Sequence, residues 1–225
     1  MNASVAASLK QVTKSYARGS DKVTPVRDLS LELPAGSMTV LTGPSGSGKT
    51  TVLNLLAGFD VPDEGEVWLG DLEVGRTSPS NLDRLRSKHL GFIFQQFNLI
   101  QGLSARENVG LALVAGGVPG PERERRAAEQ LNRFGLEGLE HRRPSHLSGG
   151  QQQRVGIARA LVGKPGVVLA DEPTAALDRE NATSILKILR DLATQDGVAV
   201  LISTHDSRCL DVADQVIVLD QERAA

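Results

Sequence analysis

The sequence predicts an α/β fold with a mostly parallel sheet. Short apolar, β-branched runs alternate along the chain with longer amphipathic helical patterns, which is typical of this class. Residues 167–170 and 198–202 are apolar at every position, as expected for strands that are covered on both faces. Hydrophobic residues make up 40% and charged residues 23% of the 225 residues, a composition that supports one large globular domain.

One segment alternates instead of being apolar throughout. Residues 26–33 place three leucines on one face of a strand and polar residues on the other. We expect this segment to pair with residues 9–13 as a half-buried antiparallel β edge, and residues 34–36 to turn into the next strand. The other expected strands span residues 38–42, 66–69, 90–94, 167–170, 198–203 and 216–219.

Helices are expected where apolar residues recur every three or four positions between start and stop signals. Ser104 and Glu107 have the spacing of a capping box, so one helix begins there. The other expected helices span residues 48–58, 121–135, 151–162 and 178–193. From the chain length we expect one domain over residues 1–225. Because no convincing strand lies between residues 95 and 162, we expect an α/β core at 1–94 and 163–225 and an inserted α-helical subdomain at 95–162.

Charge and residue usage argue against several classes of protein. Lys and Arg number 25 against 27 Asp and Glu, a formal net charge of −2, and aromatic residues are only 3% of the chain. A nucleic-acid binder is more often strongly basic and carries aromatic stacking surfaces. The single Cys209 has no partner for an internal disulfide, which fits a reducing compartment. No apolar run approaches the roughly 20 residues that span a bilayer, so the sequence predicts a soluble, cytoplasmic protein.

An eight-residue segment has the pattern G-x-x-x-x-G-K-S/T between an expected strand and an expected helix. Its residues are Gly43, Pro44, Ser45, Gly46, Ser47, Gly48, Lys49 and Thr50. The glycines let backbone N–H groups point at phosphate oxygens, and the helix N-terminus adds positive potential. Lys49 supplies a charge to the β- and γ-phosphates and Thr50 a hydroxyl to Mg²⁺. The segment predicts nucleotide binding, and the alternative is a glycine-rich turn. Its resemblance to the loop of the P-loop NTPases implies a RecA-like core with Thr51 also in the nucleotide site.

Two carboxylates follow the apolar run at residues 167–170. Asp171 and Glu172 come directly after this expected strand, at the edge where open α/β sheets bind ligands. Asp171 fits the role of holding Mg²⁺, directly or through water. Glu172 is expected on the other face of the strand end, where it fits a general base that polarises the attacking water. The alternative is a helix-capping turn before Pro173.

A second glycine-rich helix start consists of Ser148, Gly149, Gly150 and Gln151. A serine and two adjacent glycines at a helix N-terminus form a further anion-binding site. One nucleotide has a single γ-phosphate, which the first loop already wraps. The second site therefore either grips the same phosphate from the far side or belongs to another copy of the chain. The alternative is a glycine-rich N-cap without a ligand.

Together, these motifs resemble those of the ATP-binding cassette (ABC) ATPases. Residues 147–151 followed by Gln152-Gln153-Arg154 resemble the family signature, and they lie between a phosphate loop and a Leu-Ala-Asp-Glu-Pro-Thr Walker B segment. The resemblance covers residues 8–220 and implies ATP and Mg²⁺ as cofactors, with hydrolysis of ATP to ADP and phosphate. The implied catalytic residues are Lys49, Gln95, Glu172 and His205, and the implied metal ligands are Thr50, Gln95 and Asp171.

The resemblance also implies individual roles for residues outside the phosphate loop. Gln95 is similar to the Q-loop glutamine that senses the metal and the γ-phosphate, and His205 to the switch histidine that contacts the γ-phosphate. Tyr16 is similar to the aromatic residue that stacks on adenine. Asp178 lies in a segment similar to the D-loop, which implies that it couples two protomers.

Within the family, residues 91–99 and Glu107-Asn108-Val109 resemble one branch. That branch contains macrolide exporters, lipoprotein-release ATPases and cell-division ATPases, the MacB, LolD and FtsE types. The resemblance implies a homodimer of two head-to-tail chains, paired with transmembrane permease subunits of an ABC transporter. It also implies a peripheral location on the cytoplasmic face of the inner membrane. ATP binding would close the dimer and hydrolysis would reset it.

Two other functions share part of this pattern. A soluble ABC ATPase that acts on nucleic acid or ribosomes needs a long coiled-coil insertion or two cassettes in one chain, and the sequence shows neither. Arg123, Arg125 and Arg126 alternate with glutamates, as on a solvated helix face, so no nucleic-acid partner is expected. A small-molecule kinase would use the phosphate loop alone, which leaves residues 147–151 unexplained.

Overall fold

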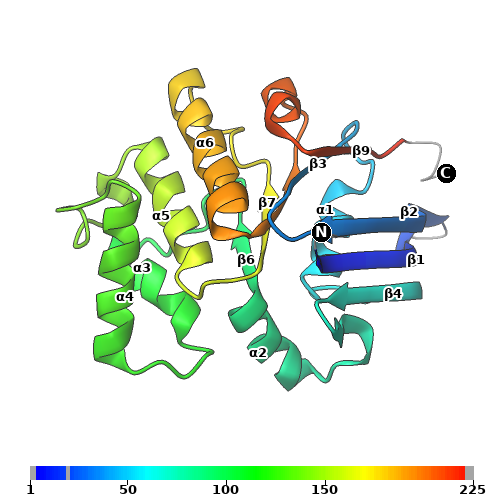
Figure 1. Ribbon diagram of the computed structural model, residues 1–225, viewed down its shortest axis with the longest axis horizontal. Helices are drawn as coiled ribbons and strands as arrows, with labels where there is room; N and C mark the ends of the chain where they lie inside the picture. Colours follow the sequence, from blue (N-terminus) through cyan, green and yellow to red (C-terminus); the bar gives the residue numbers. More distant parts are fainter. Residues whose placement is uncertain (1–3, 19–20, 221–225) are drawn as a thin grey trace.

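The computed structural model describes residues 4–18 and 21–220, which form two β-sheets beside a group of helices (Figure 1). Strands β1, β2 and β4 lie at one end of the molecule, helices α3, α4 and α5 at the other, and the parallel strands between them. The strands are β1 (Val5–Arg18), β2 (Asp21–Pro34), β3 (Met38–Thr42), β4 (Glu64–Leu69), β5 (Leu72–Glu73), β6 (Leu90–Ile93), β7 (Val167–Asp171), β8 (Ala199–Ser203) and β9 (Gln215–Val218). The α-helices are α1 (Lys49–Leu56), α2 (Pro79–His89), α3 (Ala105–Gly110), α4 (Gly120–Arg133), α5 (Gly149–Leu161) and α6 (Arg179–Asp196).

The central sheet has five parallel strands in the order β6-β7-β8-β3-β9. Strand β7 shows why the inner strands of this sheet are apolar at every position. Val168 and Ala170 pack in one buried cluster with residues of α5 and α6, whereas Val167 and Leu169 pack in another with α1 and the second sheet. Successive side chains of a strand point to opposite faces, so a strand covered on both faces is apolar at every position. The predicted parallel core is therefore confirmed.

The antiparallel strands form a separate sheet, in the order β2-β1-β4-β5, instead of an edge of the parallel sheet. Residues 9–13 and 26–33 lie in β1 and β2, which pair as predicted, but each of these strands is 14 residues long. Residues 66–69, expected in the α/β core, lie in β4 and pair antiparallel with β1. The buried residues of this sheet and of α1 form one cluster. The second sheet and α1 therefore share one buried core.

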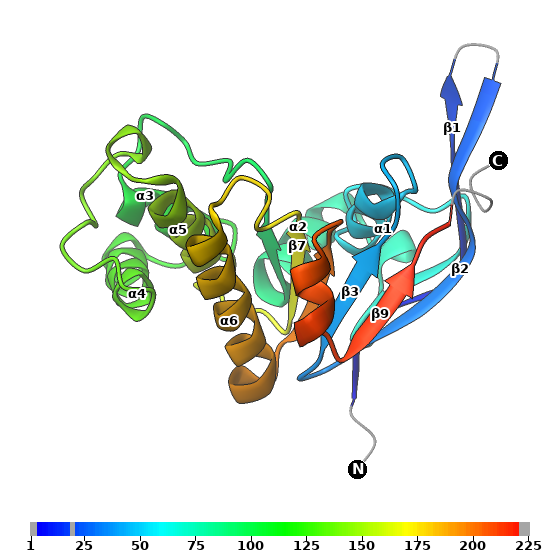
Figure 2. The same cartoon turned by 90° about the horizontal axis from the view of Figure 1, so that it is seen from above.

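Between residues 95 and 162 the described chain contains α3, α4, α5 and two 3₁₀ turns, and no strand. These helices pack around a shared set of buried side chains that includes Val109, Leu131 and Val155. Figure 2 shows α6 between this helical group and strands β3 and β9. Helix α2 was not predicted. Leu82 and Leu85 are its only large apolar residues, so its helical period is weak in the sequence.

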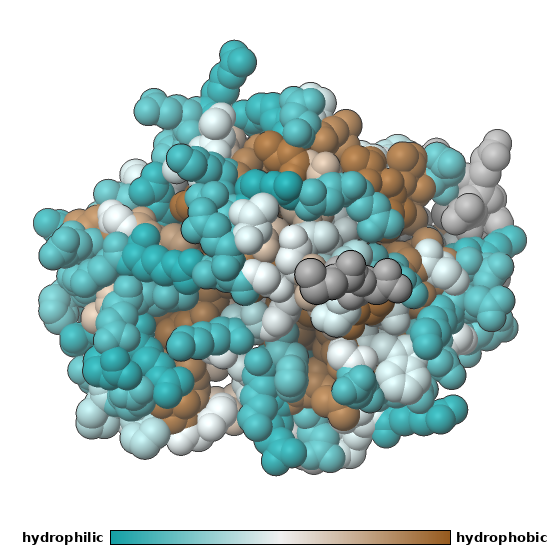
Figure 3. Space-filling view, viewed as in Figure 1, coloured by the Kyte–Doolittle hydropathy of each residue, from teal (hydrophilic) through white to brown (hydrophobic). Residues whose placement is uncertain are grey.

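No helix within residues 4–18 and 21–220 has the length and apolar content needed to cross a membrane. The face shown in Figure 3 is largely hydrophilic, and its hydrophobic side chains gather in patches, one of them over the 3₁₀ helix η4 (Ser207–Val212) and β9. Leu210, Val216 and Val218 are exposed in these two elements. Strand β9 ends the described parallel sheet and has a neighbouring strand on one side, which leaves part of its surface open.

Gly91 allows β6 and α5 to approach closely. A Cβ at this position would lie 2.4 Å from the carbonyl oxygen of Ala160, on α5, so the two backbones would have to separate. We expect Gly91→Ala to lower the free energy of unfolding by roughly 1–3 kcal/mol, the usual cost of overpacking a core. Chemical denaturation measures the loss. Gly166→Ala is the control, because a Cβ there meets nothing within 4 Å. An equal loss in both variants would contradict the packing explanation.

Candidate active site

A cleft of about 660 Å³ lies at the carboxyl ends of β3, β7 and β8, which are adjacent in the parallel sheet. It lies where open α/β sheets bind their ligands. The lining residues are Pro25, Gly43, Pro44, Ser45, Gly46, Gly48, Lys49, Thr50, Thr51, Gln95, Asp171, Glu172 and His205. The predicted site residues that do not line it are Tyr16, Ser47, Ser148, Gly149, Gly150, Gln151 and Asp178. The structure thus brings together the phosphate loop, the two carboxylates, Gln95 and His205.

The phosphate loop runs from the end of β3 into α1. At two of its glycines the backbone passes so close to the carbonyl oxygen of another segment that a side chain would clash. A Cβ at Gly43 would lie 2.4 Å from the carbonyl oxygen of Leu219, and one at Gly48 would lie 2.3 Å from that of Pro25. Gly48 has a φ of 94° and caps α1 without a side-chain hydrogen bond. The first N–H groups of α1 therefore have no side-chain capping partner. Such groups at a helix N-terminus bind anions such as phosphate.

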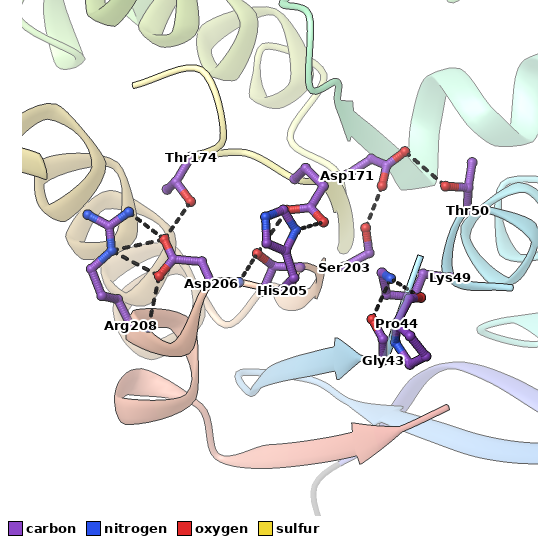
Figure 4. A network of polar contacts seen from close by, with 12 residues as sticks. Gly43, Pro44, Lys49, Thr50, Asp171, Thr174, Ser203, His205, Asp206 and Arg208 are labelled. Carbon is purple, nitrogen blue, oxygen red and sulfur yellow. Dashed lines mark hydrogen bonds and ion pairs between the residues drawn. The ribbon is translucent and has the colours of Figure 1, made fainter. Parts of the chain in front are cut away.

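Lys49 and Thr50 place a cation and a hydroxyl at the end of this loop (Figure 4). Lys49 Nζ donates to the carbonyl oxygens of Gly43 at 2.8 Å and Pro44 at 3.0 Å. Thr50 Oγ1 donates to Asp171 Oδ2 at 3.4 Å. Oδ1 of the same carboxylate accepts from the Ser203 hydroxyl at the end of β8. Carboxylate and hydroxyl oxygens are hard ligands of the kind that Mg²⁺ binds, so this part of the cleft fits a magnesium ion.

Glu172 follows β7 and is held at both carboxylate oxygens. Thr204 Oγ1 donates to Oε2 at 3.0 Å, and His205 Nδ1 lies 2.7 Å from Oε1. The side chain of Glu172 is only 13% exposed, whereas that of His205 is 74% exposed. The φ of Glu172 is 46°, a left-handed conformation that non-glycine residues adopt at a cost and that clusters at active sites. A fixed carboxylate at the edge of a cleft is suited to accept a proton from water.

Behind this pair lies a polar network that was not predicted. The N–H of Asp206 donates to Thr204 Oγ1 at 3.0 Å, and its carboxylate accepts from Thr174 at 3.2 Å and from Arg208 Nε at 2.9 Å (Figure 4). The hydrogen bonds from Arg208 lower the pKa of Asp206, so this carboxylate stays charged. The sequence shows that Thr204 and Asp206 flank His205. That Thr174 lies beside them depends on the fold.

Gln95 and Tyr16 come from outside the phosphate loop. Gln95 follows β6, lines the cleft and is exposed. Tyr16, on β1, is 40% exposed and lies beside Thr51, and its hydroxyl donates to Asp60 Oδ2 at 2.5 Å. Burial and the hydrogen bond to Asp60 raise the pKa of Tyr16, so the phenol is neutral near pH 7. The exposed part of its ring is available for stacking on a base.

The second glycine-rich helix start is formed as predicted, but it lies away from the cleft. Ser148 Oγ accepts from the N–H of Gln151 at 3.3 Å, and the Gln151 side chain accepts from the N–H of Ser148 at 2.9 Å. These bonds form a capping box at the start of α5. A Cβ at Gly150 would lie 2.5 Å from Asn181 Oδ1, so the Asn181 side chain would have to move to admit a larger residue there. The described chain therefore holds its two predicted anion-binding helix starts apart.

Asp178 caps the start of α6. Its Oδ1 accepts from the N–H of Asn181 at 2.9 Å, and its Oδ2 accepts from Asn181 Nδ2 at 2.6 Å. These hydrogen bonds lower the pKa of Asp178. Asn181 also contacts Gly150, so the start of α6 packs against the start of α5. Within one chain Asp178 acts as an N-cap, and its contact with a second protomer stays a prediction.

Comparison with known proteins agrees with the chemistry of this cleft. A protein-family profile described as ABC transporter matches residues 26–175. The chain belongs to the ABC transporter family. This ABC cassette is 41% identical over 215 residues to MJ0796 of Methanocaldococcus jannaschii, an uncharacterized ABC transporter ATP-binding protein, and the match covers 94% of this chain and 92% of that protein. It is 44% identical over 211 residues to the macrolide export ATP-binding/permease protein MacB of Pectobacterium atrosepticum, with 94% of this chain and 32% of MacB covered.

A solved structure similar to this ABC cassette is the dimeric MJ0796 cassette in a post-hydrolysis state, bound to ADP and Pi. The two share a TM-score of 0.87 at 40% identity, over 95% of this chain and 94% of that chain. The predicted family, its MacB-type branch, the α/β fold class and the ATPase function are therefore confirmed. The chain spans 32% of the length of its MacB relatives.

Proposed function

We propose that two copies of this ABC cassette close head to tail over two Mg-ATP molecules. The phosphate loop of one copy and residues 148–151 of the other would bind each molecule. The observation that carries this proposal is that one chain holds apart two helix N-termini suited to anions, at α1 and α5. A site that needs both requires two chains, and in a two-fold dimer each chain contributes to both sites. The dimeric MJ0796 cassette supports this arrangement.

The phosphate loop, Tyr16 and Thr51 bind the nucleotide in this proposal. The ammonium of Lys49, which rests on the carbonyl oxygens of Gly43 and Pro44, turns to the β- and γ-phosphates. Backbone N–H groups of the loop surround the phosphates, and Gly43 and Gly48 let the backbone come close. Tyr16 stacks on adenine with Thr51 beside it.

Thr50, Gln95 and Asp171 would hold Mg²⁺. Thr50 and Asp171 already lie within 3.4 Å of each other, and Gln95 lines the same cleft. Among the residues that the structure describes, no group of three or more His, Cys, Asp and Glu side chains is placed to hold a metal alone. Phosphate oxygens of the nucleotide, together with water, would complete the coordination. When bound, Mg²⁺ neutralises charge on the β- and γ-phosphates.

Glu172 would act as the general base. Its carboxylate takes a proton from the water that attacks the γ-phosphorus in line, and the bond from phosphorus to the β-γ bridging oxygen breaks. Thr204, directly after β8, keeps the carboxylate in position, and the exposed His205 contacts the γ-phosphate. Two protein groups thus fix the base before the phosphate binds.

Closing and opening of the cassette pair would drive transmembrane permease subunits at the cytoplasmic face of the inner membrane. The MacB relatives, which are ATP-binding/permease proteins, support a membrane partner. The cassette itself would be one domain over residues 1–225, with an α/β core at 1–94 and 163–225 and a helical subdomain at 95–162. Nucleic-acid binding finds no support: Arg125 and Arg126, on α4, pair with Glu122.

Mixing two inactive variants tests the shared site. Lys49→Ala damages the phosphate loop, and Ser148→Arg places a bulky charge at the start of α5, so homodimers of either variant have two damaged sites. A mixed dimer gathers both defects in one site and leaves the other sound. We expect mixing to restore ATPase activity, up to about half of the wild-type rate per mixed dimer if the sites work independently. Phosphate release and nucleotide-dependent dimerisation are measured together.

Thr194→Arg is the control, because it adds the same charge at an exposed hydroxyl residue on α6, far along the chain from the start of α5. We expect it to keep activity and dimerisation. Full activity and full dimerisation in Ser148→Arg alone would show that residues 148–151 do not complete the site. The shared-site proposal would then be wrong.

A further inference from the structure

Arg159, on α5, binds the loop that follows Gln95. One guanidinium nitrogen donates to the carbonyl oxygen of Asn98 at 2.6 Å, and another donates to that of Phe97 at 2.8 Å. The guanidinium carbon lies 5.9 Å from the centroid of the Phe94 ring. Arg159 is half-buried, and none of the ion pairs between described residues includes it. The charge of Arg159 therefore faces two backbone carbonyls and an aromatic ring. All three partners lie within residues 94–98, next to Gln95.

The loop that Arg159 holds has an unfavourable backbone conformation. The φ angles are 52° at Phe97 and 47° at Asn98, so two consecutive non-glycine residues lie in the left-handed region. The N–H of Asn98 donates to the carbonyl of Gln96, which closes a tight turn around Phe97. Such conformations persist only where the surroundings hold them. The two carbonyls that accept from Arg159 belong to these same two residues, so the guanidinium holds the turn where the backbone is strained.

Helix α5 connects this turn to the helix start that would complete the partner's nucleotide site. Ser148 caps one end of α5, and Arg159 lies near the other end. Between them Gln153 is buried, and its Nε2 donates to the carbonyl oxygen of Pro173, the residue after Glu172. An α-helix of this length is stiff, because each turn is hydrogen-bonded to the next. A shift of Ser148 is therefore transmitted to the turn and to the segment after the base.

We propose that Arg159 is a positioning residue for Gln95. It fastens the turn at Phe97 and Asn98 to α5, so that Gln95 reaches the metal and the γ-phosphate when α5 is seated on the partner's nucleotide. Arg159 is not among the residues that line the cleft, so it acts through the backbone of the loop. The inference rests on the role proposed above for Gln95. In this arrangement α5 makes hydrolysis in one site depend on occupancy of the other.

Steady-state ATPase kinetics at varied Mg²⁺ concentration test the proposal. We expect Arg159→Ala to lower kcat by about 10- to 100-fold, the usual cost of a displaced positioning group. We also expect a higher Mg²⁺ concentration for half-maximal activity, with an ATP affinity close to wild type because the phosphate loop is intact. Arg159→Lys keeps the charge but lacks the planar pair of donors, so it should fall between alanine and wild type.

Arg86→Ala is the matched control. Arg86 also donates to a backbone carbonyl, that of Gly58 at 2.9 Å, and lies over an aromatic ring, that of Phe59. None of these three residues lines the cleft. We expect Arg86→Ala to lower the melting temperature without changing kcat or the Mg²⁺ dependence. If Arg159→Ala behaves in the same way, Arg159 has a structural role only and the proposal is overturned.

Two further variants separate positioning from folding. Asn98→Gly makes the left-handed conformation easy to adopt, so in the Arg159→Ala background it should restore part of the lost kcat without raising the melting temperature. Gln95→Ala combined with Arg159→Ala should lose no more activity than Gln95→Ala alone, because both act through one amide. If Arg159→Ala does not fold, the recovery of kcat by Asn98→Gly is measured in the Arg159→Lys background instead.

The outcomes distinguish this inference from the role of Gln95. The role of Arg159 would be overturned if the loss of kcat in the Gln95→Ala, Arg159→Ala double variant were the product of the two single losses. It would also be overturned if Asn98→Gly did not restore any kcat. Reduced kcat in Gln95→Ala with wild-type kcat in Arg159→Ala would overturn this inference alone. Wild-type kcat in Gln95→Ala would overturn the role proposed for Gln95 and this inference with it.

Discussion

Glu172→Gln is expected to lower kcat for ATP hydrolysis by roughly 10²–10⁴-fold while ATP still binds. The amide has nearly the same shape as the carboxylate, and its oxygen can still accept from Thr204, whose Oγ1 lies 3.0 Å from Oε2. An amide is not a base at neutral pH, so the proton of the attacking water has no acceptor. Because ATP binding closes the proposed dimer and hydrolysis resets it, the variant should accumulate as an ATP-bound dimer.

Phosphate release measures the loss of turnover, and gel filtration with ATP and Mg²⁺ detects the dimer. Glu137→Gln is the control, since Glu137 is an exposed carboxylate that does not line the cleft. It should turn over ATP at the wild-type rate. Turnover near the wild-type rate in Glu172→Gln would remove Glu172 from the catalytic role. If Glu172→Gln loses turnover but stays monomeric in ATP, Glu172 keeps its role as the general base, and the proposal that ATP closes the dimer is rejected.

Lys49→Ala is expected to weaken ATP binding itself. In the proposed site the ammonium meets two phosphates, and two charge-assisted hydrogen bonds of about 1.5 kcal/mol each amount to a roughly 100-fold change in Kd. Among the residues that the structure describes, Lys49 donates to the carbonyl oxygens of Gly43 and Pro44, which also line the cleft. Its loss should therefore change the free energy of unfolding by only about 1 kcal/mol. Fluorescence titration with a labelled ATP analogue measures the affinity.

Lys88→Ala is the matched control, because Lys88 is an exposed lysine on α2 that does not line the cleft. It should leave ATP affinity at the wild-type value. An unchanged ATP affinity in Lys49→Ala would contradict the assignment of the loop. A large drop in the melting temperature of Lys49→Ala would show general unfolding instead of a lost phosphate contact.

The phosphate loop and the start of α5 were predictable because each is encoded within a few consecutive residues. The two end glycines, Lys49 and Thr50 of the loop fall within eight consecutive residues, and the capping box of Ser148 and Gln151 closes over three positions. Parallel strands were predictable for a similar reason. A strand covered on both faces is apolar throughout, and β7 and β8 show this directly in the sequence.

Two parts of the fold were not predictable in this way. Helix α2 has too few apolar residues to show a clear period, so packing against the rest of the chain decides its conformation. The second sheet depends on the pairing of β4 with β1, in which Leu9 lies opposite Val67. No local pattern marks a pairing between segments that lie so far apart in the sequence.

The sequence by itself determined the chemistry of this ABC cassette: a phosphate loop with Lys49 and Thr50, and two carboxylates at the end of a buried strand. Only the tertiary structure decided what those groups meet. Thr204 and His205 hold Glu172 because β8 lies next to β7, and Arg159 holds the loop after Gln95 because α5 packs beside β6. The physical reason is the separation along the chain over which each effect acts. Residue spacing sets backbone geometry over a few positions, whereas contacts across a sheet follow from strand order, which many weak interactions between distant segments decide together.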